Sequence, residues 1–311
     1  MKTLQFVTIL FSAGLLTAQT YVPPGEGTLS QAVADAVDGD ILELVPEGVY
    51  TESAAYLFGN ITDRSLTIRV EGEDPERAVL QILTPPDGIT TVRFFEVGDN
   101  GSLTLQDLEL DGTWGGAPNA NHGVTFDVGE VPAMTRVPTI RVEGCYFHDL
   151  LDWGLSAGST DMQGNLLIDS TFVDDTIFEN VATSIYYKYC GANYIELTNS
   201  TVNTTTSYGF RVSGPVESGM PNNTPSTTID HTTWYNIGTE DSREVIQCEK
   251  GPHLGQWVVT NSIFVKHINK DRTALNIKDT VLPAQVHHIC LWGVNTSSAN
   301  GSPVGHSPPP P

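Results

Sequence analysis

The stretch TIRVEGCYFHDL, residues 139–150, contains the pattern that decides the fold. It alternates apolar and polar residues on both sides of a glycine, which is typical of two short strands joined by a turn. The copies that follow are LLIDSTFVDDTI from Leu166, YIELTNSTVNTT from Tyr194, STTIDHTTWYNI from Ser226, QWVVTNSIFVKH from Gln256 and QVHHICLWGV from Gln285. Successive copies therefore begin 27, 28, 32, 30 and 29 residues apart.

Fainter copies and a second column of short blocks extend this repeat. SLTIRVEGED from Ser65 and SLTLQDLELDGT from Ser102 precede it, with a longer gap that leaves room for a loop. Between the copies lie HGVTFDVG, WGLSAG, SIYYKYCG, YGFRVSG, EVIQCEKG and ALNIKD. Two or three strands per coil cannot bury an apolar face alone, whereas stacked coils share one interior. The sequence therefore predicts an all-β fold, a single-stranded right-handed parallel β-helix with coils about 4.8 Å apart. An antiparallel sandwich would show turns every 8 to 12 residues or so, without a sequence repeat of about thirty residues.

The two ends of the chain differ in composition from the repeat. Residues 1–18 combine Lys2, an apolar run and a small-residue cleavage site, which predicts a signal peptide and a secreted or cell-surface protein. Residues 19–294 are then the β-helix domain. Residues 295–311, NTSSANGSPVGHSPPPP, are expected to be a Pro/Gly/Ser-rich linker or truncated tail, which leaves room for a further C-terminal domain or a cell-surface partner.

A short amphipathic helix is expected before the first coil. Leu29, Ala32, Val33, Ala36 and Val37 share one helical face, residues 38–40 stop the helix, and a strand follows at residues 41–45. This arrangement resembles the helix that caps the first coil of pectate-lyase-like β-helices. Such a cap covers strand edges that would otherwise be unpaired.

The charge of the chain narrows the classes of partner. The 37 acidic residues outnumber the 15 basic ones and give a net charge of −22. Such a surface repels nucleic acids and anionic lipids, so neither nucleic-acid binding nor membrane insertion is expected. No stretch after the leader reaches the roughly twenty apolar residues that a membrane span requires.

The four cysteines are expected to be free. Cys145 and Cys290 are placed in one column of the repeat, five coils and so about 24 Å apart, which is beyond disulfide reach. Cys190 and Cys248 fall in the second column, two coils and about 10 Å apart. The sequence predicts mostly buried thiols and no zinc ribbon.

Lys188 and Arg211 are the strongest candidates for chemistry. Strand alternation turns Tyr187, Tyr189, Phe210 and Val212 inward, which leaves Lys188 and Arg211 outward on adjacent coils. Like charges side by side on a sheet are unfavourable unless an anion neutralises them. A lysine crowded by an arginine loses its proton more readily and can act as a base, while an arginine holds a carboxylate through its fork of donors.

This pair resembles the catalytic coils of the chondroitinase B and alginate lyase family of β-helical polysaccharide lyases. The resemblance covers about residues 25 to 295 and extends to exported bacterial β-helical domains of unknown function. It implies β-elimination on a uronic acid-containing polysaccharide, with Lys188 as base, Arg211 as carboxylate clamp, and Tyr186 or Gln247 as subsite contacts. The lyases also bind calcium through two carboxylates just before the lysine, where this chain has Val181 and Thr183. No cofactor is therefore expected; calcium is possible, but its expected ligands are not found.

Other readings of the sequence remain open. A glycan-binding, structural or adhesive module without catalysis fits the missing carboxylates and the acidic surface. Glycoside hydrolysis of the polygalacturonase kind would need a tight aspartate cluster that no single coil provides. The histidines are dispersed over many coils, so no metal site is predicted, and Asp149, Asp152, Asp174 and Asp175 are expected to form turns in preference to holding calcium. Trp114, Trp153, Tyr186, Trp234 and Tyr235 supply aromatic surface for sugar rings or fill the interior.

Overall fold

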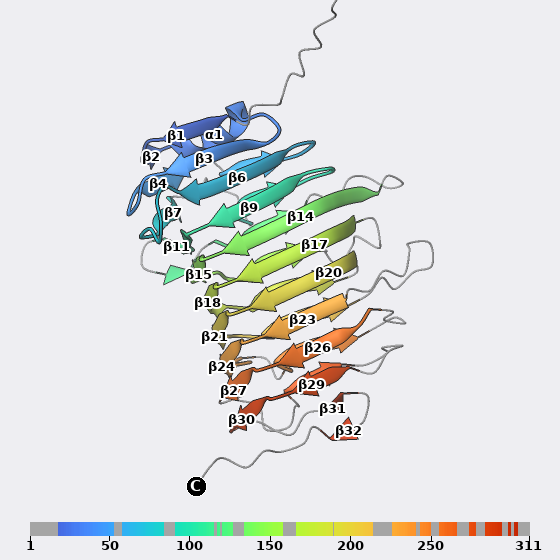
Figure 1. Ribbon diagram of the computed structural model, residues 1–311. Coiled ribbons are helices and arrows are strands. Elements are labelled where there is room, and N and C mark those ends of the chain that lie inside the picture. The colour runs from blue at the N-terminus through green and yellow to red at the C-terminus, as the bar shows by residue number, and fades with distance from the viewer. Residues whose placement is uncertain are drawn as a thin grey trace, which may run out of the picture.

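The structure is a computed structural model that describes most of the chain. The described residues are 18–52, 58–83, 91–114, 117–118, 120–126, 134–157, 166–188, 190–213, 226–240, 243–249, 255–265, 274–277, 284–293, 298–299 and 302–303. They form a column of stacked coils with the single described helix, α1 (Thr28–Asp35), at the N-terminal end (Figure 1). The predicted signal peptide lies outside the described residues, apart from Ala18.

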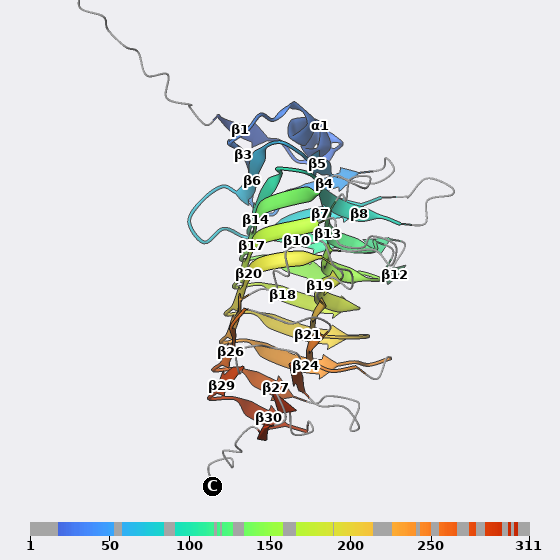
Figure 2. The ribbon, with the colours of Figure 1, turned by 90° about the vertical axis from the view of Figure 1, so that its right-hand side faces the viewer.

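Three sheets run along the column, and each coil after the first contributes one strand to each sheet (Figure 2). Sheet A contains β1 (Gln19–Val22), β3 (Asp40–Leu44), β6 (Ser65–Val70), β9 (Ser102–Gln106), β14 (Thr135–Glu143), β17 (Leu166–Asp174), β20 (Gly191–Thr198), β23 (Ser226–Asp230), β26 (Trp257–Thr260) and β29 (Gln285–His287). Sheet B contains β2 (Gly25–Glu26), β4 (Val49–Glu52), β7 (Ala78–Ile82), β10 (Leu108–Asp111), β15 (Tyr146–His148), β18 (Ile177–Val181), β21 (Thr201–Thr205), β24 (Thr233–Ile237), β27 (Ile263–Val265) and β30 (Cys290–Trp292). Sheet C contains β5 (Gly59–Ile61), β8 (Arg93–Val97), β13 (His122–Phe126), β16 (Trp153–Ala157), β19 (Thr183–Lys188), β22 (Phe210–Ser213), β25 (Ile246–Glu249), β28 (Leu275–Ile277), β31 (Ser298–Ala299) and β32 (Ser302–Pro303).

This topology confirms the predicted parallel β-helix. Every pairing within the three sheets is parallel except that of β31 with β32, and a separate two-stranded pair, β11 (Thr113–Trp114) with β12 (Ala117–Pro118), is also antiparallel. The blocks between the sequence copies are the strands of sheet C, as the second column of the repeat predicts. Sheet C also continues into β31 and β32, beyond the predicted domain boundary at residue 294.

The register differs from the predicted alignment in two places. Thr139 pairs with Ser170, 31 residues later, and Ser170 pairs with Tyr194, 24 residues later. The alignment of the repeats instead predicts that Thr139 lies beside Leu166, because the apolar residues at the start of β17 resemble the start of a repeat. Towards the C-terminus, Gln285 pairs with Val258 and not with Gln256.

The turns between sheets A and B form a column of left-handed residues. Gly144, Asp175, Asn199, His231 and Asn261 occupy this position with φ between 45° and 63°. Glycine, asparagine and aspartate adopt this conformation at the lowest cost, which explains why the repeat blocks end at these residue types. The side chains of Asn199 and Asn261 also donate hydrogen bonds to the aspartates that end the neighbouring strands, at 2.8 Å each.

The interior between the sheets is apolar and aromatic. Phe147 and Phe178 stack on adjacent coils with ring centroids 5.1 Å apart, and Trp234 stacks on Phe264 at 6.0 Å. Trp234 is fully buried, so this predicted surface candidate is a core residue. Such burial provides the stability of the column, at roughly 25 cal/mol per Å² of apolar surface removed from water.

The helix caps the first coil as predicted, with one difference. Leu29 and Val33 are buried against the column, and Ala36 is nearly so. Val37 was expected on the same face but is 63% exposed, because the helix ends at Asp35 and the chain turns away. No helix among the described residues is long and apolar enough to cross a membrane.

The cysteines are free, as predicted, and three of the four are buried. Cys290 is exposed and pairs with Ile263 on the preceding coil. Followed back from coil to coil, this register aligns Cys290 with Tyr146 and not with Cys145. The predicted common column of Cys145 and Cys290 is therefore wrong by one residue, which turns Cys290 to the outer face.

Gly154 provides a test of how tightly the coils pack. A Cβ at this position would lie 2.6 Å from the ring of Phe178 and 2.6 Å from the carbonyl oxygen of Ser184. We expect Gly154→Ala to lower the free energy of unfolding by about 1–3 kcal/mol through overpacking, measured by urea denaturation. Gly191→Ala is the control: the nearest atom to its Cβ would be the flexible end of Leu167 at 3.0 Å, and the nearest backbone atom would lie 3.6 Å away, at an ordinary contact distance. Equal losses in the two variants would contradict tight packing at Gly154.

Candidate functional site

The outer face of sheet C carries the predicted site residues. Alternation along β19 and β22 buries Ile185, Tyr187, Phe210 and Val212 in the core. Tyr186, Lys188 and Arg211 therefore lie on the opposite face, as the sequence predicts. Tyr189, which was expected to point inward, lies outside the described residues.

The register brings three of the four predicted residues into one row. Arg211 pairs with Tyr186 on one side and with Gln247 on the other. Lys188 lies on the strand beside Arg211 but pairs with Ser213, two residues further along. Lys188 and Arg211 are thus diagonal neighbours on adjacent coils and not a directly opposed pair.

Arg211 is held in place by its neighbours. Its Nη2 forms an ion pair with Glu249 Oε1 at 2.9 Å, and its Nη1 donates to the hydroxyl of Tyr186 at 3.3 Å. The guanidinium also lies over two rings, 4.7 Å from the centroid of Tyr208 and 5.4 Å from that of Tyr186. Glu249 therefore supplies the neutralising carboxylate that the sequence argument required for an arginine on this face.

Tyr186 and Arg211 belong to a longer column of stacked planar groups, which we call the π column. It contains His122, Trp153, Tyr186, Arg211 and Tyr208. Trp153 stacks on Tyr186 at 4.4 Å with an angle of 3° between the rings, and His122 stacks on the other side of Trp153 at 4.9 Å. Planar groups spaced in this way hold one another rigidly along four strands of sheet C and the segment before β22.

Sequence reasoning identified part of this column. Trp153 and Tyr186 were recognised as aromatic candidates, whereas His122 and Tyr208 were not assigned to the site. The available signal was that His122 and Trp153 stand at the first position of equivalent blocks, HGVTF and WGLSA. Of the other aromatic candidates, Tyr235 is exposed on sheet B, and the side chain of Trp114 lies outside the described part of the structure.

His122 is an uncharged member of the column at neutral pH. Burial lowers the pKa of His122 to about 4, and the positive charge of Arg93 acts in the same direction, against the opposing effect of Asp152. Its Nδ1 is buried and has no hydrogen-bond partner among the described residues. A neutral imidazole has one nitrogen that accepts a hydrogen bond and one that donates, so it can pair with a hydroxyl group in either way.

Carboxylates on this face are already bound to protein donors. Glu244 is buried and accepts hydrogen bonds from Gln247 at 3.1 Å and from Asn276 at 3.0 Å. Glu96 forms an ion pair with Arg93. The predicted subsite residue Gln247 is thus oriented by Glu244.

The positions that correspond to the calcium ligands of the lyases carry no carboxylate. Val181 is a fully buried core residue at the end of β18, and Thr183 is buried opposite Trp153 in β16. Within the described residues, the one group of three side chains that could hold a metal is Asp111, His148 and Asp149, on the outer face of sheet B.

A groove of about 440 Å³ lies elsewhere, at the turns between sheets A and B. Its lining includes Asp107, Glu143, Asp174 and Asp175, which would repel an acidic glycan. Burial raises the pKa of Asp107, and the negative charge of Glu143 adds to this effect. Asp174 ends β17 and accepts hydrogen bonds from Thr198 and Asn199, and Asp175 follows it in the left-handed turn.

No family model matches the sequence, and no curated protein matches it. Solved structures of similar fold include two of one enzyme. The PL6 family alginate lyase AlyGC matches with a TM-score of 0.59 and 18% identity over 92% of this chain and 39% of that chain. A mutant of the same enzyme, with one arginine replaced by alanine, matches with a TM-score of 0.59 and 17% identity over 95% of this chain and 41% of that chain. The chain thus spans about two fifths of the length of these structures, and the likeness is one of fold, in agreement with the parallel β-helix that its three sheets form.

The buried neutral state of His122 predicts a specific dependence of stability on pH. Because its pKa in the folded state lies below the ordinary value of 6.5, its contribution is complete above pH 6.5 and is lost as the pH falls towards 4. We expect the difference in stability between the wild type and His122→Gln to change by up to about 3 kcal/mol over this range, in the direction that disfavours the wild type at low pH. Denaturation at several pH values measures it, and a difference that stays constant with pH would contradict the assignment.

Proposed function

We propose that the protein is a secreted, carbohydrate-directed β-helix that binds a uronic acid-containing polysaccharide on the outer face of sheet C and cleaves it by β-elimination. The observation that carries the proposal is the position of Arg211 and Lys188 on adjacent strands of this face. The fold that the chain shares with an alginate lyase supports the choice of substrate class. Secretion rests on the leader sequence in residues 1–18.

Basic residues gather on this face, where Glu96 and Glu249 pair with two of them. The protein as a whole is strongly acidic, so an acidic polysaccharide needs a local concentration of positive charge. Four of the fifteen basic residues lie on or beside the outer face of sheet C: Arg93, Lys188, Arg211 and Arg243. Their contribution to binding should weaken as salt screens the charges.

Arg211 is suited to hold the carboxylate of a uronic acid. A guanidinium has five N–H donors in a fixed plane, and its contacts to Tyr186 and Glu249 occupy only part of this set. The stacked rings on either side fix that plane before a ligand arrives, which reduces the entropy lost on binding. Tyr186 and Gln247, which flank Arg211 in the same row, would contact the neighbouring sugar.

Lys188 would remove the proton from C5 of the bound uronic acid. The uncharged amine takes the proton, the C5–H electron pair forms the C4–C5 double bond, and the bond from C4 to the glycosidic oxygen breaks. The departing oxygen takes a proton from solvent. Arg211 stabilises the negative charge that develops on the carboxylate during proton removal.

A glycan-binding module without catalysis is the second candidate. The observations that favour it are the pairing of Arg211 with Glu249 and the absence of carboxylates at Val181 and Thr183. In this alternative the π column and the basic residues would bind sugar without proton transfer, as aromatic and cationic side chains do in many carbohydrate sites.

Replacement of Lys188 tests the lyase proposal. The wild type, incubated with alginate and with other uronic acid polysaccharides, should generate an unsaturated sugar that absorbs in the ultraviolet. Lys188→Ala and Lys188→Arg should each reduce kcat/KM by about 10²- to 10⁴-fold, because neither provides a base at neutral pH. Lys188→Arg should retain binding in affinity electrophoresis, since it keeps the positive charge.

The matched control is Arg136→Gln, which removes a positive charge from the exposed surface of sheet A, where Arg136 pairs with Asp169. This variant should keep full activity. A flat absorbance trace across the substrate panel, together with retardation of the wild type in glycan-containing gels, would reject the lyase and support the binding module.

A further inference from the structure

The outer face of sheet B carries a second cluster of chemically active side chains. Asp111 ends β10 and pairs directly with His148, which ends β15 on the next coil. Asp149 follows His148 in a left-handed turn, with φ of 55°, a conformation that aspartate adopts more readily than most residues. These three side chains come from adjacent coils. Asp111 precedes His148 by 37 residues and Asp149 by 38, whereas His148 and Asp149 are consecutive in the chain.

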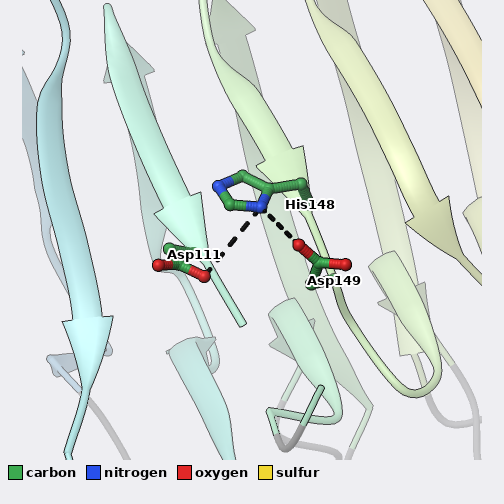
Figure 3. Close-up of side chains that lie close together, drawn as sticks. All are labelled: Asp111, His148 and Asp149. Carbon is green, nitrogen blue, oxygen red and sulfur yellow. Dashed lines mark hydrogen bonds and ion pairs between the residues drawn. The ribbon is translucent and has the colours of Figure 1, made fainter. Parts of the chain in front are cut away.

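The three side chains converge on one point (Figure 3). His148 Nδ1 lies 2.9 Å from Asp149 Oδ2 and 3.9 Å from Asp111 Oδ1. In a tetrahedral zinc site with bonds of about 2.0–2.1 Å, two ligand atoms lie about 3.3 Å apart. The two separations lie on either side of that value. The side chains of His148 and Asp111 are 13% and 14% exposed, so the point is sheltered but reachable from solvent.

Carboxylates lie beside both ring nitrogens of His148. Its other ring nitrogen, Nε2, lies 3.2 Å from Glu109 Oε1. A neutral imidazole has one N–H and one lone pair, so either tautomer points a lone pair at a carboxylate. If Nε2–H donates to Glu109, the lone pair of Nδ1 faces both aspartates, and these three side chains then surround a position that suits a metal ion. Histidines that bind metals commonly donate their second N–H to a carboxylate in this way.

The surrounding hydrogen bonds fix the aspartates without neutralising them. Asp111 Oδ1 accepts from the backbone N–H and the hydroxyl of Thr113 at 2.8 and 2.7 Å, and its Oδ2 accepts from Gln81 at 2.8 Å. Asp149 Oδ1 accepts from the amide of Asn180. In the part of the chain that the structure describes, Asp111, Asp149 and Glu109 form no ion pair with lysine or arginine.

We propose that Asp111, His148 and Asp149 form a binding site for a divalent transition-metal ion, with Zn²⁺ as the best fit, and that Glu109 orients His148. One imidazole nitrogen and two carboxylate oxygens match zinc, with water as the fourth ligand. Calcium and magnesium prefer oxygen ligands alone, so the imidazole disfavours them. The site lies on sheet B, whereas the proposed glycan face is on sheet C, and it joins two coils. Its role is therefore to stabilise the column, independently of the proposed activity.

Titration of the purified full-length protein, stripped of metal with a chelator, tests the site. Isothermal titration with Zn²⁺ alone should show one saturable site per chain, with weaker binding of Mn²⁺ and little of Ca²⁺. Asp111→Asn and His148→Gln should abolish this site. Glu109→Gln, which keeps all three ligands, should weaken Zn²⁺ affinity by about 10- to 100-fold, as loss of a ligand-orienting partner does.

His231→Gln provides the matched control. His231 pairs with a single carboxylate, Asp230, at 2.8 Å on an exposed turn and lacks the second aspartate. Its loss should leave Zn²⁺ binding unchanged. Zn²⁺ should also raise the Tm of the wild type and of His231→Gln, but not that of Asp111→Asn, whose folding is checked by circular dichroism.

Two results would overturn the proposal. One is the absence of a saturable Zn²⁺ site in the wild type. The other is equal Zn²⁺ affinity in the wild type, in Asp111→Asn and in Glu109→Gln, which would place the ion elsewhere on the acidic surface. Because Glu109→Gln leaves the turn at Asp149 intact, this variant decides the question even if Asp111→Asn folds poorly.

Discussion

Parallel pairing of each strand with its equivalent one coil later is the interaction on which the whole structure depends. It satisfies the backbone hydrogen bonds of both strands and stacks like residues on like, so that the apolar faces of successive coils form one interior. A single coil would expose most of its apolar residues. The stacking of Phe147 on Phe178 and of Trp234 on Phe264 shows how aromatic rings on neighbouring coils share that interior.

The same pairing determines what the outer faces can do. Because side chains alternate across a strand, every inward residue of the core has outward neighbours that are aligned with those of the next coil. On sheet C this alignment places Tyr186, Arg211 and Gln247 in one row. On sheet B it places Asp111 beside His148. Rigid, repeated strands thus hold polar groups in fixed positions for binding or chemistry.

The sequence predicts some parts of these sites better than others. Lys188 and Arg211 were assigned to one face of adjacent coils, since alternation within a short block is a local property. Their diagonal offset was not predicted, because it depends on the number of residues in the turn between the blocks. The contact of Glu249 with Arg211 was missed for the same reason: Glu249 is separated from Arg211 by 38 residues. The column of Cys145 and Cys290 was misplaced by one residue at the last coil, because the differences in register at the two earlier coils cancel.

The local sequence pattern is sufficient to determine the coil repeat, the inward and outward alternation, the capping helix and the free cysteines. Each of these depends on residues close together in the chain or on the constant rise of a stacked coil. Which side chains meet across coils was decided only by the tertiary structure. The pairs that become neighbours in this way include Asp111 with His148 and His122 with Trp153. Their positions depend on the hydrogen-bonded register, which in turn depends on the length of every turn between them. That register is a property of the folded chain, and no single stretch of sequence contains it.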